Sequence, residues 1–143
     1  MRIGDVLGAK PSQEVVTIPP EAGVRDLVAA LAEHNVGALI VSSDGSTVEG
    51  IVSERDVVRH LHHAGTVVNN TVSDIMTTDV ETCEPDVLLD DLMKIMTDKR
   101  IRHVPVVEDG ALVGIVSIGD VVKHRIDQLK FERDQLDSYV HQS

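Results

Sequence analysis

Two serine–aspartate pairs have residue types and spacing suited to binding a phosphorylated sugar. Ser53 and Asp56 follow an apolar Gly-Ile-Val segment, and Ser117 and Asp120 follow the same three residues later in the chain. A carboxylate can accept hydrogen bonds from both vicinal hydroxyls of a ribose, as acidic residues do in other nucleotide sites. A serine hydroxyl can donate to the ribose or to a phosphate. The two pairs are therefore candidate nucleotide-binding residues.

Each pair is expected where a strand ends and a helix begins. The free amide donors and the positive dipole end of a helix N-terminus favour a phosphate. Between serine and aspartate, Gly119 exposes backbone for close approach, whereas Arg55 offers a charge. The same spacing is close to a capping box, in which the serine caps the helix and the acid reaches back to the backbone. Capping needs no ligand, so the residues alone leave both interpretations open.

The pairs belong to an internal repeat that covers most of the chain. Residues 50–58, GIVSERDVV, return as residues 114–122, GIVSIGDVV. Other residues recur in the same order: Thr17 as Thr82, Pro20 as Pro85 and Asp26 as Asp91. One repeat of this length buries too little surface to be comfortably stable alone, so the halves should pack together. Two related half-sites that face each other are therefore expected.

Each repeat predicts the order strand, helix, strand, strand, helix. In the first repeat these elements are expected at residues 15–18, 24–31, 38–42, 49–52 and 54–63, with a hairpin turn at Asp44-Gly45. In the second repeat they are expected at residues 80–83, 88–96, 103–107 and 112–116, with a helix opening at Ser117. The predicted fold is α+β, with two β-α-β-β-α repeats packed about a pseudo-twofold axis. The predicted parts are residues 1–66, 67–126 and 127–143, the last being a C-terminal helical extension.

The final helix is expected to run without a breaker to about Tyr139. Apolar residues fall along it at alternating four- and three-residue steps, with Arg133 at the missing step: Val122, Ile126, Leu129, Leu136 and Val140. Such a seam suits packing on a neighbouring helix, such as that of a second copy. The alternative is a helix that folds back on its own domain.

Composition excludes several classes of protein. The chain has 143 residues, a net charge of −11, one Phe, one Tyr and no Trp, which disfavours direct nucleic-acid binding. No apolar run approaches the length of a membrane span, and the N-terminus lacks the apolar stretch of a signal peptide. A single cysteine fits a reducing compartment. We therefore expect a cytoplasmic protein with no membrane partner.

Taken together, three kinds of segment resemble the CBS domain. They are Asp-Ile-Met-Thr at residues 74–77, Arg-Ile-Arg-His-Val-Pro-Val-Val at residues 100–107, and both Gly-Ile-Val-Ser-x-x-Asp segments. Two such domains in tandem resemble a Bateman module, and the resemblance covers residues 4–124. It implies a disk-like pair, often a homodimer, that binds AMP, ADP, ATP or S-adenosylmethionine between the repeats. It implies regulation and no catalysis.

The resemblance also implies two unequal clefts. One holds Ser117, Gly119 and Asp120, with phosphate contacts from Arg102 and His103 and an adenine wall from Lys10 to Val15. The other holds Ser53, Arg55 and Asp56, with its wall drawn from Met76, Thr77, Thr78 and Val80. The first cleft is expected to bind a phosphorylated adenosine more tightly. Alternatively, Arg100, Arg102 and His103 form a solvated cationic patch.

The leading functional hypothesis is a sensor that binds an adenine nucleotide, AMP, ADP or ATP above all, and relays to an unknown effector protein. The alternative is a ligand-independent oligomerisation or interaction module. No cofactor or metal is expected: His60, His62 and His63 fit a solvated helix end better than a metal site. No activated nucleophile or paired acid and base is apparent, so an enzyme is not expected.

Overall fold

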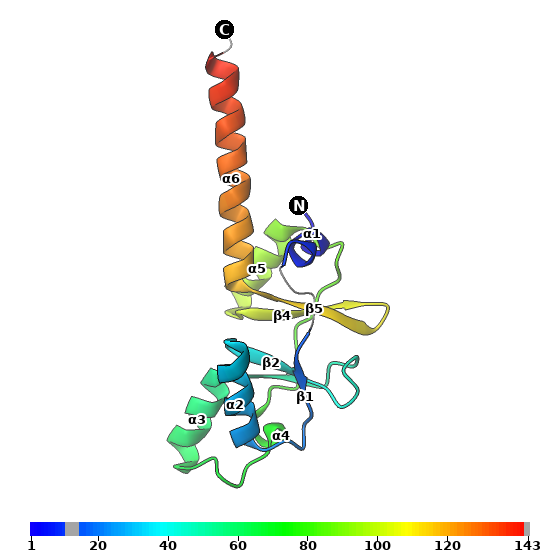
Figure 1. Cartoon of the computed structure of the whole chain (residues 1–143), viewed down its shortest axis with the longest axis vertical. Coiled ribbons are helices and arrows are strands. Elements are labelled where there is room, and N and C mark those ends of the chain that lie inside the picture. The colour runs from blue at the N-terminus through cyan, green and yellow to red at the C-terminus, as the bar shows by residue number, and fades with distance from the viewer. Residues whose placement is uncertain (11–14, 142–143) are drawn as a thin grey trace.

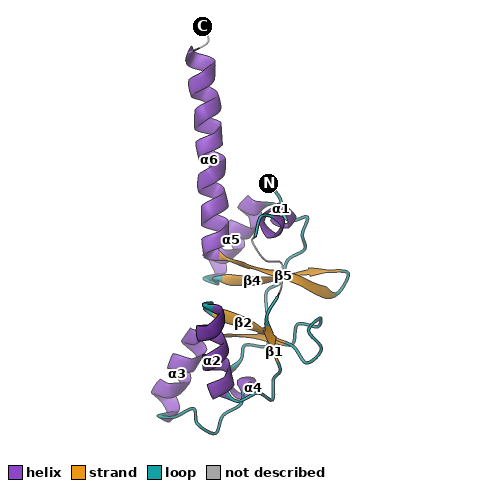
Figure 2. Ribbon diagram, in the orientation of Figure 1, coloured by secondary structure: helices purple, strands orange, loops and turns teal. Residues whose placement is uncertain are grey.

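The computed structural model describes residues 1–10 and 15–141, which form two lobes stacked along one axis (Figure 1). The sheets of the two lobes lie next to each other at the centre, with helices on their outer sides (Figure 2). The first lobe contains β1 (Thr17–Ile18), α2 (Val24–His34), β2 (Ala38–Val41), β3 (Gly50–Ser53) and α3 (Glu54–Ala64). The second contains α5 (Leu89–Lys99), β4 (His103–Glu108), β5 (Ala111–Ser117) and α6 (Ile118–His141). Two further short helices are α1 (Ile3–Gly8) and α4 (Val72–Ile75).

The first lobe is built around a three-stranded sheet in the order β1-β2-β3. β1 runs parallel to β2, and β2 runs antiparallel to β3. All four residues of β2 are buried, and α2 packs Val24, Leu27 and Leu31 against the same core. The expected strand–helix–strand–strand–helix order is therefore confirmed in this lobe.

In the second lobe the predicted first strand, residues 80–83, is wrong. Only Cys83 forms a bridge, parallel to Val106 of β4, while β4 and β5 make a two-stranded sheet. The residues just before this segment are bound to the first lobe, because the Thr77 N–H donates to the carbonyl of Ile51 at 2.9 Å. The chain between residues 77 and 83 therefore crosses from one lobe to the other and cannot pair along its length.

A short helix completes the core of each lobe. α1 precedes the first repeat but packs in the second lobe, and α4 precedes the second repeat but packs in the first lobe. Ile3 and Val6 of α1 are fully buried in the core of the second lobe, and the Ile3 N–H donates to the carbonyl of Val87 at 2.9 Å. Val72 of α4 is fully buried in the core of the first lobe, and its N–H donates to the carbonyl of Ala22 at 2.8 Å. The sequence analysis did not predict either helix. This exchange ties the lobes together and fixes the gap between them.

α6 stands away from both lobes over most of its length (Figure 1). Val121 in its first turn is buried, whereas all residues from 129 to 141 are exposed. The alternative in which this helix folds back on its own domain is therefore wrong. The predicted start of the extension at residue 127 lies inside this continuous helix, so the domain boundaries stay a prediction. No helix in the described part of the chain is long and apolar enough to cross a membrane.

Candidate ligand-binding cleft

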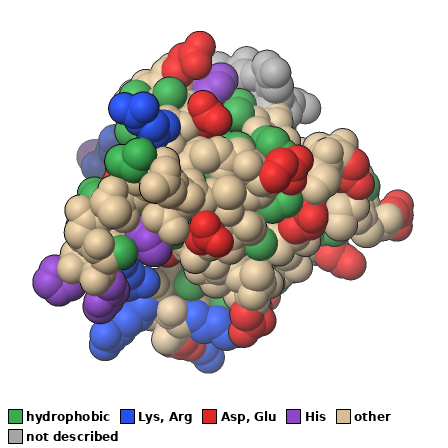
Figure 3. Space-filling model, turned by 90° about the horizontal axis from the view of Figure 1, so that it is seen from below, with side chains coloured by type: hydrophobic (Ala, Val, Ile, Leu, Met, Phe, Trp, Pro, Cys, Tyr) green, Lys and Arg blue, Asp and Glu red, His purple; other side chains and the backbone are tan. Residues whose placement is uncertain are grey.

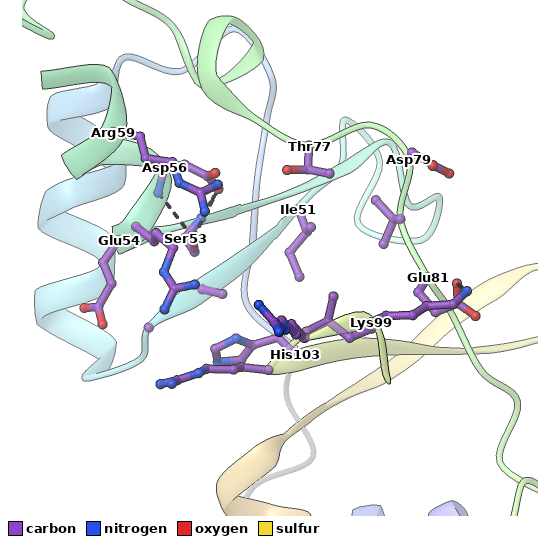
Figure 4. A pocket seen from close by; sticks show the side chains of 17 residues that line it. Ile51, Ser53, Glu54, Asp56, Arg59, Thr77, Asp79, Glu81, Lys99 and His103 are labelled. Carbon is purple, nitrogen blue, oxygen red and sulfur yellow. Dashed lines mark hydrogen bonds and ion pairs between the residues drawn. The ribbon is translucent and has the colours of Figure 1, made fainter. Parts of the chain in front are cut away.

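A cleft of about 400 Å³ lies between the two lobes, within the size range of small-molecule sites (Figure 4). Four segments form it: the start of β2, the end of β3 with the start of α3, the segment between residues 77 and 83 that crosses between the lobes, and the end of α5 with the start of β4. The residues that line it are Gly37, Ala38, Ile51, Ser53, Glu54, Arg55, Asp56, Arg59, Thr77, Asp79, Val80, Glu81, Lys99, Arg100, Ile101, Arg102 and His103.

Asp56 lies one turn into α3 and faces this cleft (Figure 4). Its Oδ2 accepts hydrogen bonds from the Ser53 N–H at 2.8 Å and the Ser53 hydroxyl at 3.1 Å. The Asp56 N–H in turn lies 3.4 Å from Ser53 Oγ, which completes the capping box. All these contacts use one carboxylate oxygen. Within the described residues Oδ1 has no hydrogen-bond partner, so capping leaves that oxygen available to a hydroxyl of a ligand.

Four arginines line the cleft without a carboxylate partner. Arg55 and Arg59 lie one turn apart on α3, and Arg100 and Arg102 lie in the turn between α5 and β4. In the described part of the chain, no acid lies within ion-pair distance of these guanidinium groups. Lys99, by contrast, pairs with Glu81 at 2.6 Å. Planar guanidinium groups match phosphate geometry, so this arrangement suits an anionic ligand.

The cationic cluster contrasts with the net charge of −11 of the chain. Seen along the long axis from the first lobe, Lys and Arg side chains gather along one edge with histidines nearby, whereas acidic side chains are scattered over the rest (Figure 3). An anionic ligand would be repelled by most of this surface and attracted to that edge.

His103 is half-buried at the floor of the cleft, next to Gly37 of the first lobe. Burial lowers the pKa of His103 below its usual value. Asp120 and Glu54 act in the opposite direction, and Arg102 and Lys10 add to the lowering. The imidazole is therefore mainly neutral at physiological pH.

Asp120 has different neighbours from Asp56. Its Oδ2 lies 2.9 Å from Lys10 Nζ and accepts from the Ser117 N–H at 3.0 Å. Lys10 Nζ also donates to the carbonyl of Ile115 at 2.7 Å. Burial raises the pKa of Asp120, but the hydrogen bonds from the Ser117 N–H and Lys10 outweigh it and hold this pKa below its usual value. The Asp120 N–H lies 3.2 Å from Ser117 Oγ, so the second pair is also a reciprocal cap.

The structure distributes the predicted site residues differently from the sequence analysis. Seven line the described cleft: Ser53, Arg55, Asp56, Thr77, Val80, Arg102 and His103. Lys10, Ser117 and Asp120 form a second group. Gly119 lies in the first turn of α6 beside them, and Val15 is half-buried. Residues 11–14 of the predicted adenine wall lie outside the described residues. Met76 instead packs against the core of the first lobe, and Thr78 does not line this cleft.

Arg102 and His103, which were assigned from the sequence to the cleft of Asp120, both line the cleft of Asp56. His103 also lies in register with Ser117 of β5 and is influenced by the charge of Asp120, so the assignment to the Asp120 cleft stays a prediction. The two repeats place equivalent residues near the boundary between the lobes. The Glu54 N–H donates to the carbonyl of Gly37 at 3.0 Å, and the Ile118 N–H donates to that of Arg102 at 2.8 Å. These hydrogen bonds are equivalent in the two repeats, and a Cβ on Gly37 would lie 3.7 Å from His103 Cε1, so the start of β4 approaches the first lobe.

Several lining residues were missed by the sequence analysis, namely Arg59, Lys99, Ile101, Glu54, Asp79 and Glu81. Arg59 could have been found, because it follows Arg55 by one helical turn and must share its face. Lys99 and Glu81 are 18 residues apart and meet only through the fold. No local pattern predicts their pairing.

Neither histidines nor the cysteine form a reactive centre in the described part of the chain. No group of three or more His, Cys, Asp or Glu residues there could hold a metal ion. His60 Nε2 lies 3.1 Å from Asn70 Oδ1. Cys83 is buried, and burial raises its pKa to about 11, which suits a core residue and not a nucleophile.

Comparison with known proteins gives two matches to one family model, described as "CBS domain", over residues 3–63 and 72–127. A curated relative, the mitochondrial CBS domain-containing protein CBSX3 of Arabidopsis thaliana, is 39% identical over 122 residues. That match covers 82% of this chain but only 59% of the relative, so the chain spans less than two thirds of that protein.

Solved structures resemble the whole two-lobed arrangement. The CBS-domain containing protein ATU1752 from Agrobacterium tumefaciens is 42% identical with a TM-score of 0.82, covering 87% of this chain and 99% of that one. The CBS domain pair of protein MJ0100, solved in complex with 5-methylthioadenosine and S-adenosyl-L-methionine, is 26% identical with a TM-score of 0.76. That match covers 86% of this chain and 98% of the other.

Proposed function

The chain belongs to the CBS domain family, and from that premise we propose that it binds an adenosine-containing ligand in the cleft at Asp56 and relays this binding to a partner protein. CBS pairs are regulatory ligand-binding modules and not catalytic ones, which the resemblance to ATU1752 and to the ligand-bound pair supports. The observation that carries the proposal is the cleft at Asp56, where, among the described residues, one carboxylate oxygen of Asp56 has no hydrogen-bond partner and four arginines have no ion-pair partner.

Each part of an adenosine nucleotide has a matching group in this cleft. Oδ1 of Asp56 can accept from ribose hydroxyls while Oδ2 keeps its capping bonds. Arg55, Arg59, Arg100 and Arg102 can bind phosphates, since their guanidinium groups have no described ion-pair partner. Ile51 and Val80, with the Thr77 backbone, can form an apolar wall for the adenine. We therefore favour AMP, ADP or ATP over the cationic S-adenosylmethionine.

A second, weaker site is proposed at Ser117, Gly119 and Asp120. Lys10 already neutralises Asp120 at 2.9 Å, so a ligand there would compete with an existing ion pair. The arginines line the other cleft, which reverses the order of affinity that the sequence analysis predicted. Met76, Thr78 and Val15 are proposed only as outer neighbours of the two sites.

The relay requires that the ligand bind one arrangement of the lobes better than another. The cleft draws its lining from both lobes, so closing it on a ligand would change how they pack. We also propose that the protein is a cytoplasmic homodimer that contacts an effector protein and binds neither nucleic acid nor a membrane.

A thermal-shift panel with AMP, ADP, ATP, S-adenosylmethionine, 5-methylthioadenosine and NAD tests ligand binding. A ligand present at 100 times its dissociation constant should stabilise the protein by about 2.7 kcal/mol. If no compound in the panel raises the melting temperature, the result would contradict the proposal and favour the ligand-independent interaction module.

The matched variants Asp56→Asn and Asp120→Asn test which cleft is used. Each removes the carboxylate of one capping box, so their effects on helix capping should be similar. We expect Asp56→Asn to raise the dissociation constant of the nucleotide found in the panel by at least about tenfold, which corresponds to about 1.4 kcal/mol. Asp120→Asn should raise it much less. Isothermal titration calorimetry measures both, and equal losses would contradict the assignment to the Asp56 cleft.

A further inference from the structure

Within the described residues, no other element packs on the exposed side chains of Leu129 and Leu136 in the second half of α6. Every residue from Leu129 to His141 is exposed, and the helix extends away from the lobes (Figure 1). Isolated helices shorter than about 12 to 15 residues are marginal in water, and most helix stability in proteins comes from packing of an apolar face. Another surface against this half of α6 would therefore stabilise it.

Most of the exposed aliphatic residues of α6 form one seam with the spacing of a coiled coil, whereas Phe131, 62% exposed, lies off it at heptad position f. Ile126, Leu129 and Leu136 are 46%, 48% and 66% exposed, although large aliphatic side chains are usually buried. The spacing places Ile126 and Arg133 at heptad position a, and Leu129 and Leu136 at position d. A single arginine at an a position lowers stability but specifies how helices pair.

Charges beside the seam distinguish the two possible orientations of a pair of identical helices. Arg125 and Glu132 occupy g positions, and Lys130 and Asp137 occupy e positions. In a parallel pair each g residue faces the following e residue of the other helix, so Arg125 would face the partner's Lys130. Glu132 would likewise face the partner's Asp137. Both contacts join like charges, which disfavours the parallel arrangement. The contact of Glu132 with Asp137 carries most of this argument, because Arg125 also pairs with Asp90 at 3.6 Å.

In an antiparallel pair, e positions face e positions. With Leu136 opposite the partner's Arg133, Lys130 lies opposite the partner's Asp137, and the twofold axis repeats this contact. The outer layers then place Leu129 opposite the partner's Val140. Both e-position contacts therefore join opposite charges in this register. Neither places a residue opposite the same residue of the partner.

We propose that α6 pairs with α6 of a second copy of this chain as an antiparallel coiled coil, in the register that joins Lys130 to the partner's Asp137. This inference rests on the homodimer proposed above and names its contact element. The lobes of the two copies then lie at opposite ends of the coil, and both clefts remain open to ligand.

Sedimentation equilibrium of Leu136→Asp, with Gln135→Asp as its matched control, tests the surface. Both variants add one negative charge to an exposed turn of α6, but only residue 136 lies on the seam. We expect Leu136→Asp to raise the dimer dissociation constant at least about tenfold, because it removes apolar burial and buries a charge. Gln135→Asp should leave it unchanged.

Charge reversal tests the orientation. In the antiparallel register Lys130→Glu faces the partner's Asp137 and should weaken the dimer, and the double variant Lys130→Glu/Asp137→Lys should restore it. In a parallel pair Lys130→Glu would face the partner's Arg125 and strengthen the dimer, which would overturn the orientation. A wild-type dimer insensitive to Leu136→Asp overturns the inference but leaves the proposed homodimer standing, whereas a monomeric wild type overturns both. Ligand binding in the thermal-shift panel is independent of all these outcomes.

Discussion

The two Ser-x-x-Asp pairs are locally alike, yet the side chains around them differ. Asp56 accepts a hydrogen bond from the Ser53 N–H at 2.8 Å, and Asp120 accepts one from the Ser117 N–H at 3.0 Å. Lys10 forms an ion pair with Asp120, whereas the four arginines that line the cleft of Asp56 have no acidic partner among the described residues. A ligand at Asp56 gains charge-assisted hydrogen bonds without breaking an ion pair. This difference, and not the motif itself, is the basis for distinguishing a binding site from a helix cap.

His103 gives the cleft a predicted pH dependence. Burial lowers its pKa in the free protein, so the unfolded chain takes up a proton at higher pH than the folded one. Its contribution to stability is therefore present above the unfolded pKa of about 6.5 and is lost as pH falls through the lower folded value. A phosphate in the cleft would raise this pKa again. We expect nucleotide binding to take up a proton and to tighten as pH falls from 8 towards 6, by at most about tenfold per pH unit.

Calorimetric titration in two buffers of different ionisation enthalpy measures that proton uptake. His103→Gln should abolish the dependence on buffer, while His34→Gln, an exposed histidine on α2 outside the cleft, should retain it. Identical heats for the wild type in both buffers would show that His103 does not sense the ligand.

The helices of several turns, and the strands bounded by clear turn signals, were predictable from the sequence. α2, α5, β2 and β3 lie within a few residues of their expected positions, because periodicity and turn signals are local. α1 and α4 were missed since helices of six and four residues carry too little periodicity. The strand expected at residues 80–83 failed for a tertiary reason, because its neighbours bond to opposite lobes.

The same limit explains which part of the site could be predicted. Ser53 and Asp56 are set by spacing within one strand–helix junction, so the sequence identifies them and their cap. Which cation faces which acid depends on how the start of β4 approaches the first lobe, where His103 Cε1 would lie 3.7 Å from a Cβ on Gly37. That contact joins residues from two lobes, and no window of sequence contains it.

The crossing segment packs so closely on β3 that Gly50 has no room for a side chain. A Cβ there would lie 2.9 Å from the Thr77 carbonyl oxygen and 2.8 Å from Met76 Sδ. Thr77 cannot move freely, since the same oxygen accepts the Ile51 N–H at 2.9 Å. We expect Gly50→Ala to lower the free energy of unfolding by about 1–3 kcal/mol through overpacking.

The equivalent glycine of the second repeat provides a matched control for that variant. The three atoms nearest to a Cβ at Gly114 would all belong to the Leu7 side chain, the nearest at 2.7 Å, and a leucine can change rotamer. Gly114→Ala should therefore be milder than Gly50→Ala in urea unfolding. The reverse order would mean that the crossing segment is not fixed to β3.

The two lobes depend on each other through exchanged segments more than through their sheets. The core of the first lobe draws on Val72, Ile75 and Met76, which lie after the end of its own repeat. The core of the second draws on Ile3, Val6 and Leu7, which lie before the first repeat begins. A boundary placed by repeat alone, at residue 66, therefore leaves both halves with incomplete cores. The cleft lies where these segments cross, so its shape depends on the whole molecule.

This exchange predicts which fragment of the chain holds structure. All residues of the first core lie between residues 16 and 76, so a fragment of residues 16–77 contains that core entire. A fragment of residues 1–66 is slightly longer but lacks Val72, which is fully buried, and it exposes Ile3 and Val6. Each fully buried aliphatic side chain contributes about 1.5–3 kcal/mol, which is large for a domain of this size. We expect fragment 16–77 to show more helix by circular dichroism and a more cooperative thermal transition than fragment 1–66. A fragment 1–66 that melts at the same or a higher temperature would mean that α4 is not part of the first core.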